Sequence, residues 1–168
     1  AVNSALQRAR ATVSGGMPAR SQQSVLRALG DHRTRDIVRR YSDAMEQGDA
    51  DTLVSMLTQD VTWSMPPYPT WFQGLPAVRD WLIRDPLSEC WKHLPARANG
   101  QLAVGCYLLD RDRGGYAPAV IDVLTLDGER IAAVTGFSAG LPVGEQPGDR
   151  QVSGAAVFAR FGLPARLP

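Results

Sequence analysis

Apolar residues recur at helical spacing in the first half of the chain. The first helix of the main body is predicted to begin at Thr34, as its N-cap, and to end at Gly48, a residue type that commonly terminates helices. The apolar positions of this helix are Ile37, Val38, Tyr41, Ala44 and Met45. Asp49 is expected to cap a second, short helix, and residues 75–83 are expected to form a third.

Residues 61–65 alternate between apolar and polar side chains, and after Pro86 the pattern changes to a series of strands separated by turn signals. The expected strands are 61–65, 90–98, 101–109, 116–126 and 129–138. Asn99-Gly100 and Asp127-Gly128 are strong signals for two-residue hairpin turns, and the first of them places Cys106 opposite His93. Helices followed by consecutive antiparallel strands predict an α+β domain, in which a curved antiparallel sheet packs on three N-terminal helices.

The remaining segments surround this domain. Residues 1–13 have one apolar stripe and no N-cap signal, so we interpret them as the end of a helix whose first turns lie outside this chain. Residues 14–33 are expected to be a linker, residues 34–140 the main domain and residues 141–168 a mostly irregular extension. Within the extension, 155–161 is expected to form a short helix that ends at Gly162.

Composition narrows the class of protein. Hydrophobic residues make up 44% and charged residues 21% of the chain, as in a typical globular protein. No run of about 18 apolar residues is present and the first residues lack the pattern of a secretory signal, so we expect a cytoplasmic protein that does not span a membrane. The two cysteines fit a reducing compartment, and neither they nor the two histidines have metal-ligand spacing.

Charge is distributed unevenly along the chain. Residues 1–40 contain eight arginines and two aspartates, a net charge of +6, whereas the whole chain has a formal net charge of +1. The remaining residues therefore carry −5. A basic N-terminal part followed by an acidic remainder suggests that residues 1–40 face a polyanion. The alternative is that these arginines lie on solvated helix faces and in a linker.

The N-terminal run Val2-Asn3-Ser4-Ala5-Leu6-Gln7-Arg8-Ala9-Arg10 resembles the end of region 4 in extracytoplasmic-function (ECF) sigma factors, where a helix-turn-helix reads the −35 promoter element. The resemblance implies DNA-binding residues, with the arginines on phosphates. These residues are Asn3, Ser4, Gln7, Arg8 and Arg10. Base specificity would come from earlier positions of the helix. The alternative interpretation is an amphipathic helix that packs against the body.

Residues 34–140 resemble SnoaL-like domains, which have the fold of nuclear transport factor 2 (NTF2). The resemblance rests on Trp63-Ser64-Met65-Pro66-Pro67 and Trp71-Phe72-Gln73-Gly74, followed by a helix and four strands. Together with the N-terminal run and the ending Phe158 to Pro164, the chain is similar to ECF sigma factors with a C-terminal SnoaL-like domain. That similarity implies RNA polymerase core, promoter DNA and the sigma core domains as partners. A DGGGK-type motif of a related subgroup is absent.

A cone-shaped domain of this kind implies a pocket between the concave face of the sheet and the helices. The expected pocket residues are Trp63, Met65, Tyr68, Trp71, Phe72, Arg97, Tyr107 and Asp122. Aromatic side chains with a polar end suit a small apolar ligand, although Met65 is better explained by core packing. Asp122 lies in an otherwise apolar strand and needs a partner if buried, for which we expect Arg97.

These observations favour a non-enzymatic regulatory domain of a sigma factor, with no cofactor and no catalytic residues. One alternative is a small isomerase, dehydratase or epoxide hydrolase that uses Asp122, as ketosteroid isomerase uses an aspartate on a related fold. Another is homodimerisation through the convex face of the sheet, because both faces of 119–126 and 131–134 are apolar.

Overall fold

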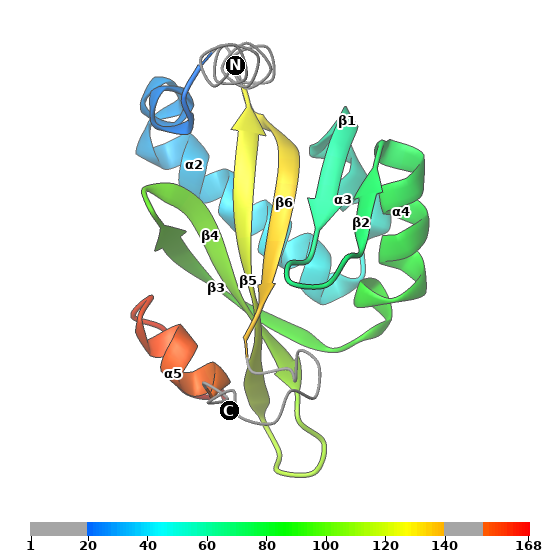
Figure 1. The fold of residues 1–168 in the computed structure, drawn as a ribbon, viewed down its shortest axis with the longest axis vertical. Coiled ribbons are helices and arrows are strands. Elements are labelled where there is room, and N and C mark those ends of the chain that lie inside the picture. Colours follow the sequence, from blue (N-terminus) through cyan, green and yellow to red (C-terminus); the bar gives the residue numbers. More distant parts are fainter. Residues whose placement is uncertain (1–19, 140–152) are drawn as a thin grey trace, which may run out of the picture.

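The computed structural model describes residues 20–139 and 153–168, and a curved six-stranded sheet forms its centre (Figure 1). The strands are β1 (Leu57–Ser64), β2 (Trp71–Gln73), β3 (Trp91–Ala98), β4 (Gln101–Leu109), β5 (Tyr116–Asp127) and β6 (Arg130–Ser138). Their order is β2-β1-β6-β5-β4-β3. The α+β class is confirmed. The sheet is mixed, however, because β1 and β6 are parallel. The expectation of a wholly antiparallel sheet was wrong at this junction, where no hairpin turn sets the strand direction.

Three helices cover one face of the sheet, which we call the inner face. They are α2 (Gln22–Gln47), α3 (Ala50–Ser55) and α4 (Leu75–Arg84), followed by a 3-10 turn at Pro86–Ser88. In Figure 1, α2 crosses behind the strands and α4 lies beside the edge formed by β1 and β2.

The first helix begins earlier than the sequence suggested. Ser21 caps α2 by accepting a hydrogen bond from the backbone of Ser24, and the helix is interrupted only at Gly30, whose φ is 75°. The hydroxyl of Thr34, expected to be an N-cap, instead donates to the carbonyl of Gly30 at 3.1 Å. The described part of the expected linker, 20–33, is therefore mainly the first part of α2.

The first hairpin has the expected register. Ala98 pairs with Gln101, so Asn99 and Gly100 form the turn with φ values of 50° and 76°. His93 lies opposite Cys106, as predicted. In the second hairpin Asp127 pairs with Arg130, which places the turn one residue later than expected.

The main hydrophobic core fills the space between the inner face and the helices. Strand alternation sends Leu102, Val104 and Cys106 into it from β4. Fully buried members from other elements are Tyr41, Leu53, Leu57, Val61, Val78, Leu82, Ile131 and Val134. Burial of each large apolar side chain contributes about 1.5–3 kcal/mol, so this core holds the helices against the sheet.

The opposite, outer face of the sheet is partly covered by the C-terminal extension. Its helix, α5 (Gly154–Ala159), confirms the short helix expected there, and Phe158 packs fully buried against Tyr107 and Ile121. Gly105 makes the close approach possible: a Cβ atom there would lie 2.4 Å from Cδ1 of Leu163. The end of the chain is held by an isolated β-bridge between Tyr116 and Leu167.

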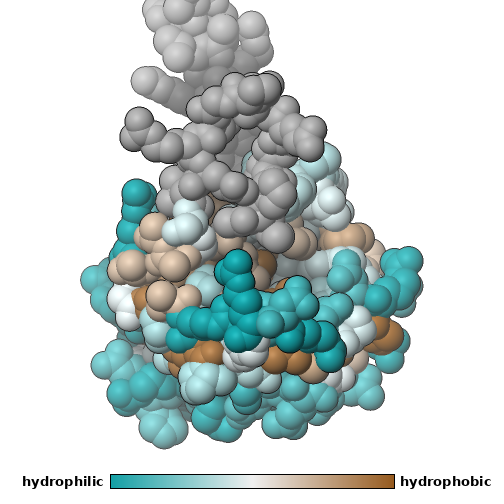
Figure 2. Space-filling view, turned by 90° about the horizontal axis from the view of Figure 1, so that it is seen from below, coloured by the Kyte–Doolittle hydropathy of each residue, from teal (hydrophilic) through white to brown (hydrophobic). Residues whose placement is uncertain are grey.

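One end of the molecule is largely hydrophilic. Seen from below the view of Figure 1, the described residues are mostly hydrophilic with smaller apolar patches between them (Figure 2). Within the described ranges, no helix combines the length and apolar character required to cross a membrane.

Candidate functional site

A small cavity lies between the inner face of the sheet, the C-terminal half of α2 and α4. Its volume is about 50 Å³, enough for a few water molecules but well below a cavity that holds benzene. It is lined by Met45, Trp63, Met65, Trp81, Pro86, Trp91, His93, Cys106, Val120, Asp122 and Gly136. The expected pocket therefore exists, but it is too small for a ligand of drug size.

Asp122 is the buried carboxylate of this cavity, with an exposed fraction of 4%. Its Oδ2 atom accepts hydrogen bonds from the hydroxyl of Tyr41 at 2.8 Å and the thiol of Cys106 at 3.3 Å. Burial raises the pKa of Asp122 above its ordinary value, and the two hydrogen bonds oppose that rise. Within residues 20–139 and 153–168, this carboxyl group thus has two side-chain donors and no cationic partner.

The expected pairing of Asp122 with Arg97 was wrong. Arg97 is exposed and lies opposite Leu102, near the hairpin turn, whereas Asp122 lies opposite Val104, two positions further along β4. Arg97 borders an open groove between α2 and β3 instead of the cavity.

His93 brings an imidazole to the same cavity, and its side chain is fully buried. Among the residues that the structure describes, neither ring nitrogen has a hydrogen-bond partner, although Nδ1 lies 3.5 Å from Oε1 of Glu46. Burial lowers the pKa of His93 to about 4, because removal from water outweighs the attraction of Glu46. The ring is therefore neutral at pH 7 and offers one acceptor nitrogen.

Aromatic rings form the walls. The rings of Trp63 and Trp81 meet at 63° with centroids 5.2 Å apart, and the ring of Phe72 stacks on Trp81 with centroids 4.9 Å apart. Trp91 is fixed by the hydrogen bond that its Nε1 donates to the carbonyl of Pro86 at 2.6 Å. These contacts hold the tryptophans in position.

Three of the predicted pocket residues line the cavity: Trp63, Met65 and Asp122. Tyr68, Trp71 and Phe72 are not among its lining residues, and Trp71 is 60% exposed. Whether any of them contacts a ligand stays a prediction.

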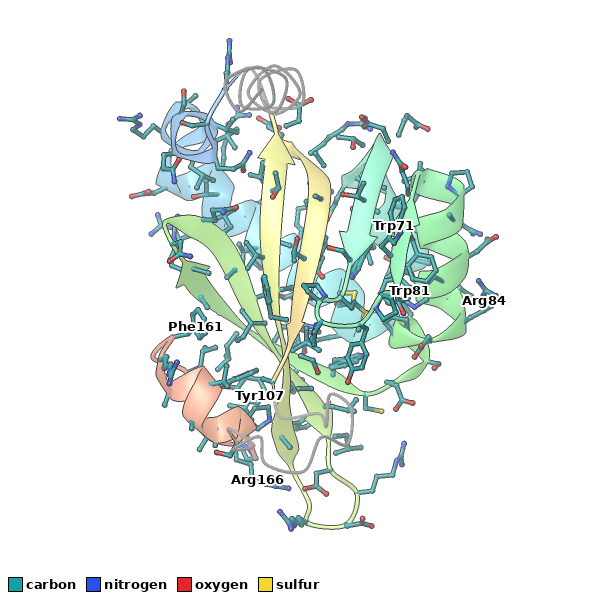
Figure 3. The ribbon with its side chains drawn as sticks, viewed as in Figure 1. Trp71, Trp81, Arg84, Tyr107, Phe161 and Arg166 are labelled. Atoms are coloured by element: carbon teal, nitrogen blue, oxygen red, sulfur yellow. The ribbon has the colours of Figure 1, made fainter. Side chains whose placement is uncertain are left out.

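Tyr107 lies on the other side of the sheet from the cavity. Neighbouring residues of a strand point to opposite faces, so the inward direction of Cys106 turns Tyr107 outward. Its hydroxyl donates to the carbonyl of Pro164 at 2.8 Å, and Figure 3 shows it near α5 and far from Trp81. Its expected place in the pocket was wrong.

Sequence reasoning missed Tyr41, His93, Cys106 and Trp91 as members of the site. For two of them a signal existed, because the predicted hairpin register already set His93 opposite Cys106. Strand alternation then puts Cys106 on the same face as Asp122.

Other expected sites are not part of this cavity. The candidate DNA-binding residues Asn3, Ser4, Gln7, Arg8 and Arg10 lie outside the described residues. In residues 20–139 and 153–168, no group of three or more histidine, cysteine, aspartate or glutamate side chains is arranged to hold a metal ion.

Replacing Tyr41 by Phe tests the hydrogen bond to Asp122. The variant removes the strongest donor to a buried carboxylate, so we expect the free energy of unfolding to fall by about 2 kcal/mol at pH 7. Urea denaturation measures the change. Tyr116→Phe is the control, since the hydrogen bonds found for Tyr116 are made by its backbone and the variant keeps the ring. Equal stability of both variants would contradict a structural role for this hydrogen bond.

Comparison with known proteins adds two findings at the level of sequence. Residues 38–134 match the family described as SnoaL-like domain. The chain is also 31% identical over 174 residues to the ECF RNA polymerase sigma factor SigG of Mycobacterium tuberculosis, in strains H37Rv and CDC 1551. This match covers 99% of the chain and 41% of the relative, so the chain spans less than half the length of that sigma factor.

Solved structures share the fold at low sequence identity. An NTF-2 like protein of unknown function from Burkholderia xenovorans LB400 matches with a TM-score of 0.57 and 13% identity, over 71% of this chain and 91% of the other. A putative ketosteroid isomerase from Kribbella flavida DSM 17836 matches with a TM-score of 0.51 and 20% identity, over 71% and 86%. These likenesses concern the fold alone.

Proposed function

This chain belongs to the family of SnoaL-like domains, and from that premise we propose that it is the C-terminal regulatory part of a bacterial ECF sigma factor. In this proposal it docks on the sigma core or on RNA polymerase in the cytoplasm and changes how efficiently promoters are used. The observation that carries the proposal is the similarity to SigG, which extends over 99% of the chain and so includes the basic N-terminal segment as well as the SnoaL-like domain.

The position of α2 supports a regulatory role. At its first turn, the side chain of Gln22 donates to the carbonyl of Leu126 and accepts from its amide, both at 2.8 Å. Near its other end, Tyr41 bonds to Asp122 and Met45 lines the cavity. The helix α2 therefore begins where the N-terminal segment joins the body and reaches the cavity near its other end.

A change at the cavity can act through this helix. A ligand or docking partner alters the position of the DNA-binding segment only if it binds two arrangements with different affinity. The bonds of Gln22 tie the start of α2 to the end of β5, so a shift of this strand together with the cavity changes the point from which the preceding segment leaves the body. We infer that docking of the body and placement of the basic segment are coupled by this route.

Transcription in vitro tests the proposal. Full-length sigma factor is compared with a form that lacks residues 20–168, on the same promoter and with the same RNA polymerase. A coupling free energy of ordinary size changes promoter output about fivefold or more. Identical output from both forms would overturn the regulatory role.

A pair of point variants examines the junction itself. Gln22→Ala removes both bonds to Leu126 and is expected to shift promoter output towards that of the truncated form. Gln23→Ala is the matched control, because Gln23 is exposed and lies next to Gln22 on the same helix. Equal effects of the two variants would show that the junction contact does not transmit the regulation.

A small enzyme remains the second candidate function. It is favoured by a buried carboxyl group and an unpartnered imidazole in one cavity, the groups that general acid–base catalysis uses. The volume of about 50 Å³ argues against a substrate as large as a steroid. Turnover of a smaller carbonyl compound that is lost in Asp122→Asn would favour this candidate over the first.

A further inference from the structure

The cavity concentrates tryptophan around one carboxylate. The chain has four tryptophans, and three of them, Trp63, Trp81 and Trp91, line the cavity, whereas the fourth, Trp71, is 60% exposed. The face of an indole ring carries negative electrostatic potential and attracts cations. Phe72 stacks on one face of Trp81 and Tyr41 on one face of Trp63, and the indole surface that remains beside the carboxylate favours a positive charge.

Acceptor atoms in the cavity are available to a ligand. Both side-chain hydrogen bonds to Asp122 fall on Oδ2, which leaves Oδ1 for the cavity. Gly136 keeps the space beside this atom open, since a Cβ atom there would lie 2.9 Å from Oδ1. His93, fully buried and without a hydrogen-bond partner in the described ranges, supplies a second acceptor from one ring nitrogen. A ligand with N–H donors can satisfy both groups.

The described part of the chain supplies no positive charge at this place. Neither lysine nor arginine occurs among the residues that line the cavity. A buried carboxylate without a counter-ion is costly, and a cation that enters beside it removes part of that cost. An anionic ligand would be repelled by Asp122, and a neutral apolar ligand would leave Oδ1 and the acceptor nitrogen of His93 unsatisfied.

We propose that this cavity binds a small organic cation, namely an amine or methylated ammonium group, hydrogen-bonded to Asp122 and in contact with the tryptophan rings that line the cavity. The volume of about 50 Å³ limits the buried part to about four non-hydrogen atoms. Met65, Trp81 and Trp91 are half-buried and leave the cavity open on one side, where a larger ligand extends outward. The inference rests on the proposed function, because it names the ligand class of the regulatory cavity.

Titration of the 168-residue chain with trimethylammonium chloride tests the proposal. Tryptophan fluorescence reports binding directly because three of the four tryptophans line the cavity, and calorimetry gives an independent Kd. For a group of this size we expect a Kd on the order of 1 mM. The neutral tert-butanol, of similar shape, is expected to bind about tenfold more weakly, with sodium chloride keeping the ionic strength constant.

Two variants locate the binding. Asp122→Asn keeps the shape but removes the charge, and is expected to weaken trimethylammonium binding about tenfold or more without weakening tert-butanol. Trp81→Leu removes one aromatic wall at a half-buried position and is expected to weaken trimethylammonium binding about threefold or more. Trp71→Leu, at an exposed position, is the matched control and is expected to leave binding unchanged. Trp81→Leu keeps the test available if Asp122→Asn fails to fold by circular dichroism.

The outcomes separate this inference from the regulatory proposal. Equal binding of tert-butanol and trimethylammonium, or no saturable signal below about 100 mM, would overturn the cation site. Binding that depends on Asp122 and Trp81 supports it even if removal of residues 20–168 leaves transcription unchanged. In that case the cation site stands and the regulatory role falls.

Discussion

Lowering the pH from 7 to 5 is expected to destabilise the protein by about 2 kcal/mol relative to its His93→Phe variant, rising to about 3 kcal/mol at pH 4. The cause is the buried imidazole, whose pKa is lowered to about 4 in the folded protein by its removal from water. In the unfolded chain the same group has the ordinary value of 6.5.

The sign follows from proton binding. Between pH 6.5 and pH 4 the unfolded chain takes up a proton on His93 and the folded protein does not, so unfolding is favoured as the pH falls. Well above pH 6.5 His93 is neutral in both states, so this loss of stability is absent there. The carboxyl of Asp122 acts in the opposite direction, because its raised pKa favours the folded state at low pH. The comparison with His93→Phe separates the two, since Asp122 is common to both proteins.

Urea denaturation at a series of pH values measures the difference. At pH 7 we expect His93→Phe to be as stable as the unchanged protein or slightly more stable, because the imidazole has no hydrogen bond to lose. His32, the only other histidine, is exposed, so His32→Gln should keep the acid sensitivity. Parallel pH profiles for the unchanged protein and His93→Phe would show that the imidazole is hydrated or protonated when folded.

The parts of the fold that sequence predicted correctly are those fixed by local chemistry. Asn99-Gly100 sets the turn of the first hairpin, because both residues adopt positive φ, and the turn then fixes every pair along β3 and β4. Gly48 ends α2 in the left-handed conformation for the same kind of reason. At such positions, one or two residues determine the local backbone structure.

The errors arose where distant segments meet. Thr34 has the chemistry of an N-cap, but Val25 is buried against the core, and this burial extends α2 back to Gln22 across the break at Gly30. The pairing of β2 with β1 depends on Trp71 to Gln73 returning along Thr62 to Ser64, which no local pattern indicates. Tertiary packing decided both cases.

The candidate site also divides into residues placed by local pattern and residues placed by contacts between distant segments. Its strand residues follow from the hairpin register and the alternation of side chains, so Asp122, Cys106 and His93 were within reach of sequence reasoning. Applied strictly, the same alternation excludes Tyr107. The contact of Tyr41 with Asp122 was not within reach, because it depends on how a helix 81 residues away packs on the sheet.

The outer face of the sheet raises a separate question, that of self-association. Its apolar residues include Ala103 and Ile121, and these are buried by α5 and by Leu163. The C-terminal extension therefore occupies part of the surface through which we considered homodimerisation. Association of two copies through that part requires the extension to leave it.

Replacing Phe158 by Ala is expected to lower the free energy of unfolding by about 3–5 kcal/mol. Phe158 is fully buried, and its ring meets Tyr107 edge to face with centroids 4.9 Å apart. A helix as short as the six residues of α5 is not stable by itself, so its position depends on this side chain. Val157→Ala, a smaller change at a half-buried position of the same helix, should cost about 1 kcal/mol or less.

Urea denaturation and sedimentation together show what the extension does. If α5 covers the outer face in solution, Phe158→Ala exposes Ala103, Ile121 and Leu163, and the variant should self-associate at concentrations where the unchanged protein does not. Val157→Ala should sediment like the unchanged protein. A stability loss below about 1 kcal/mol without association would mean that the extension contributes little to the fold, because a well-packed aromatic anchor cannot be removed at so small a cost.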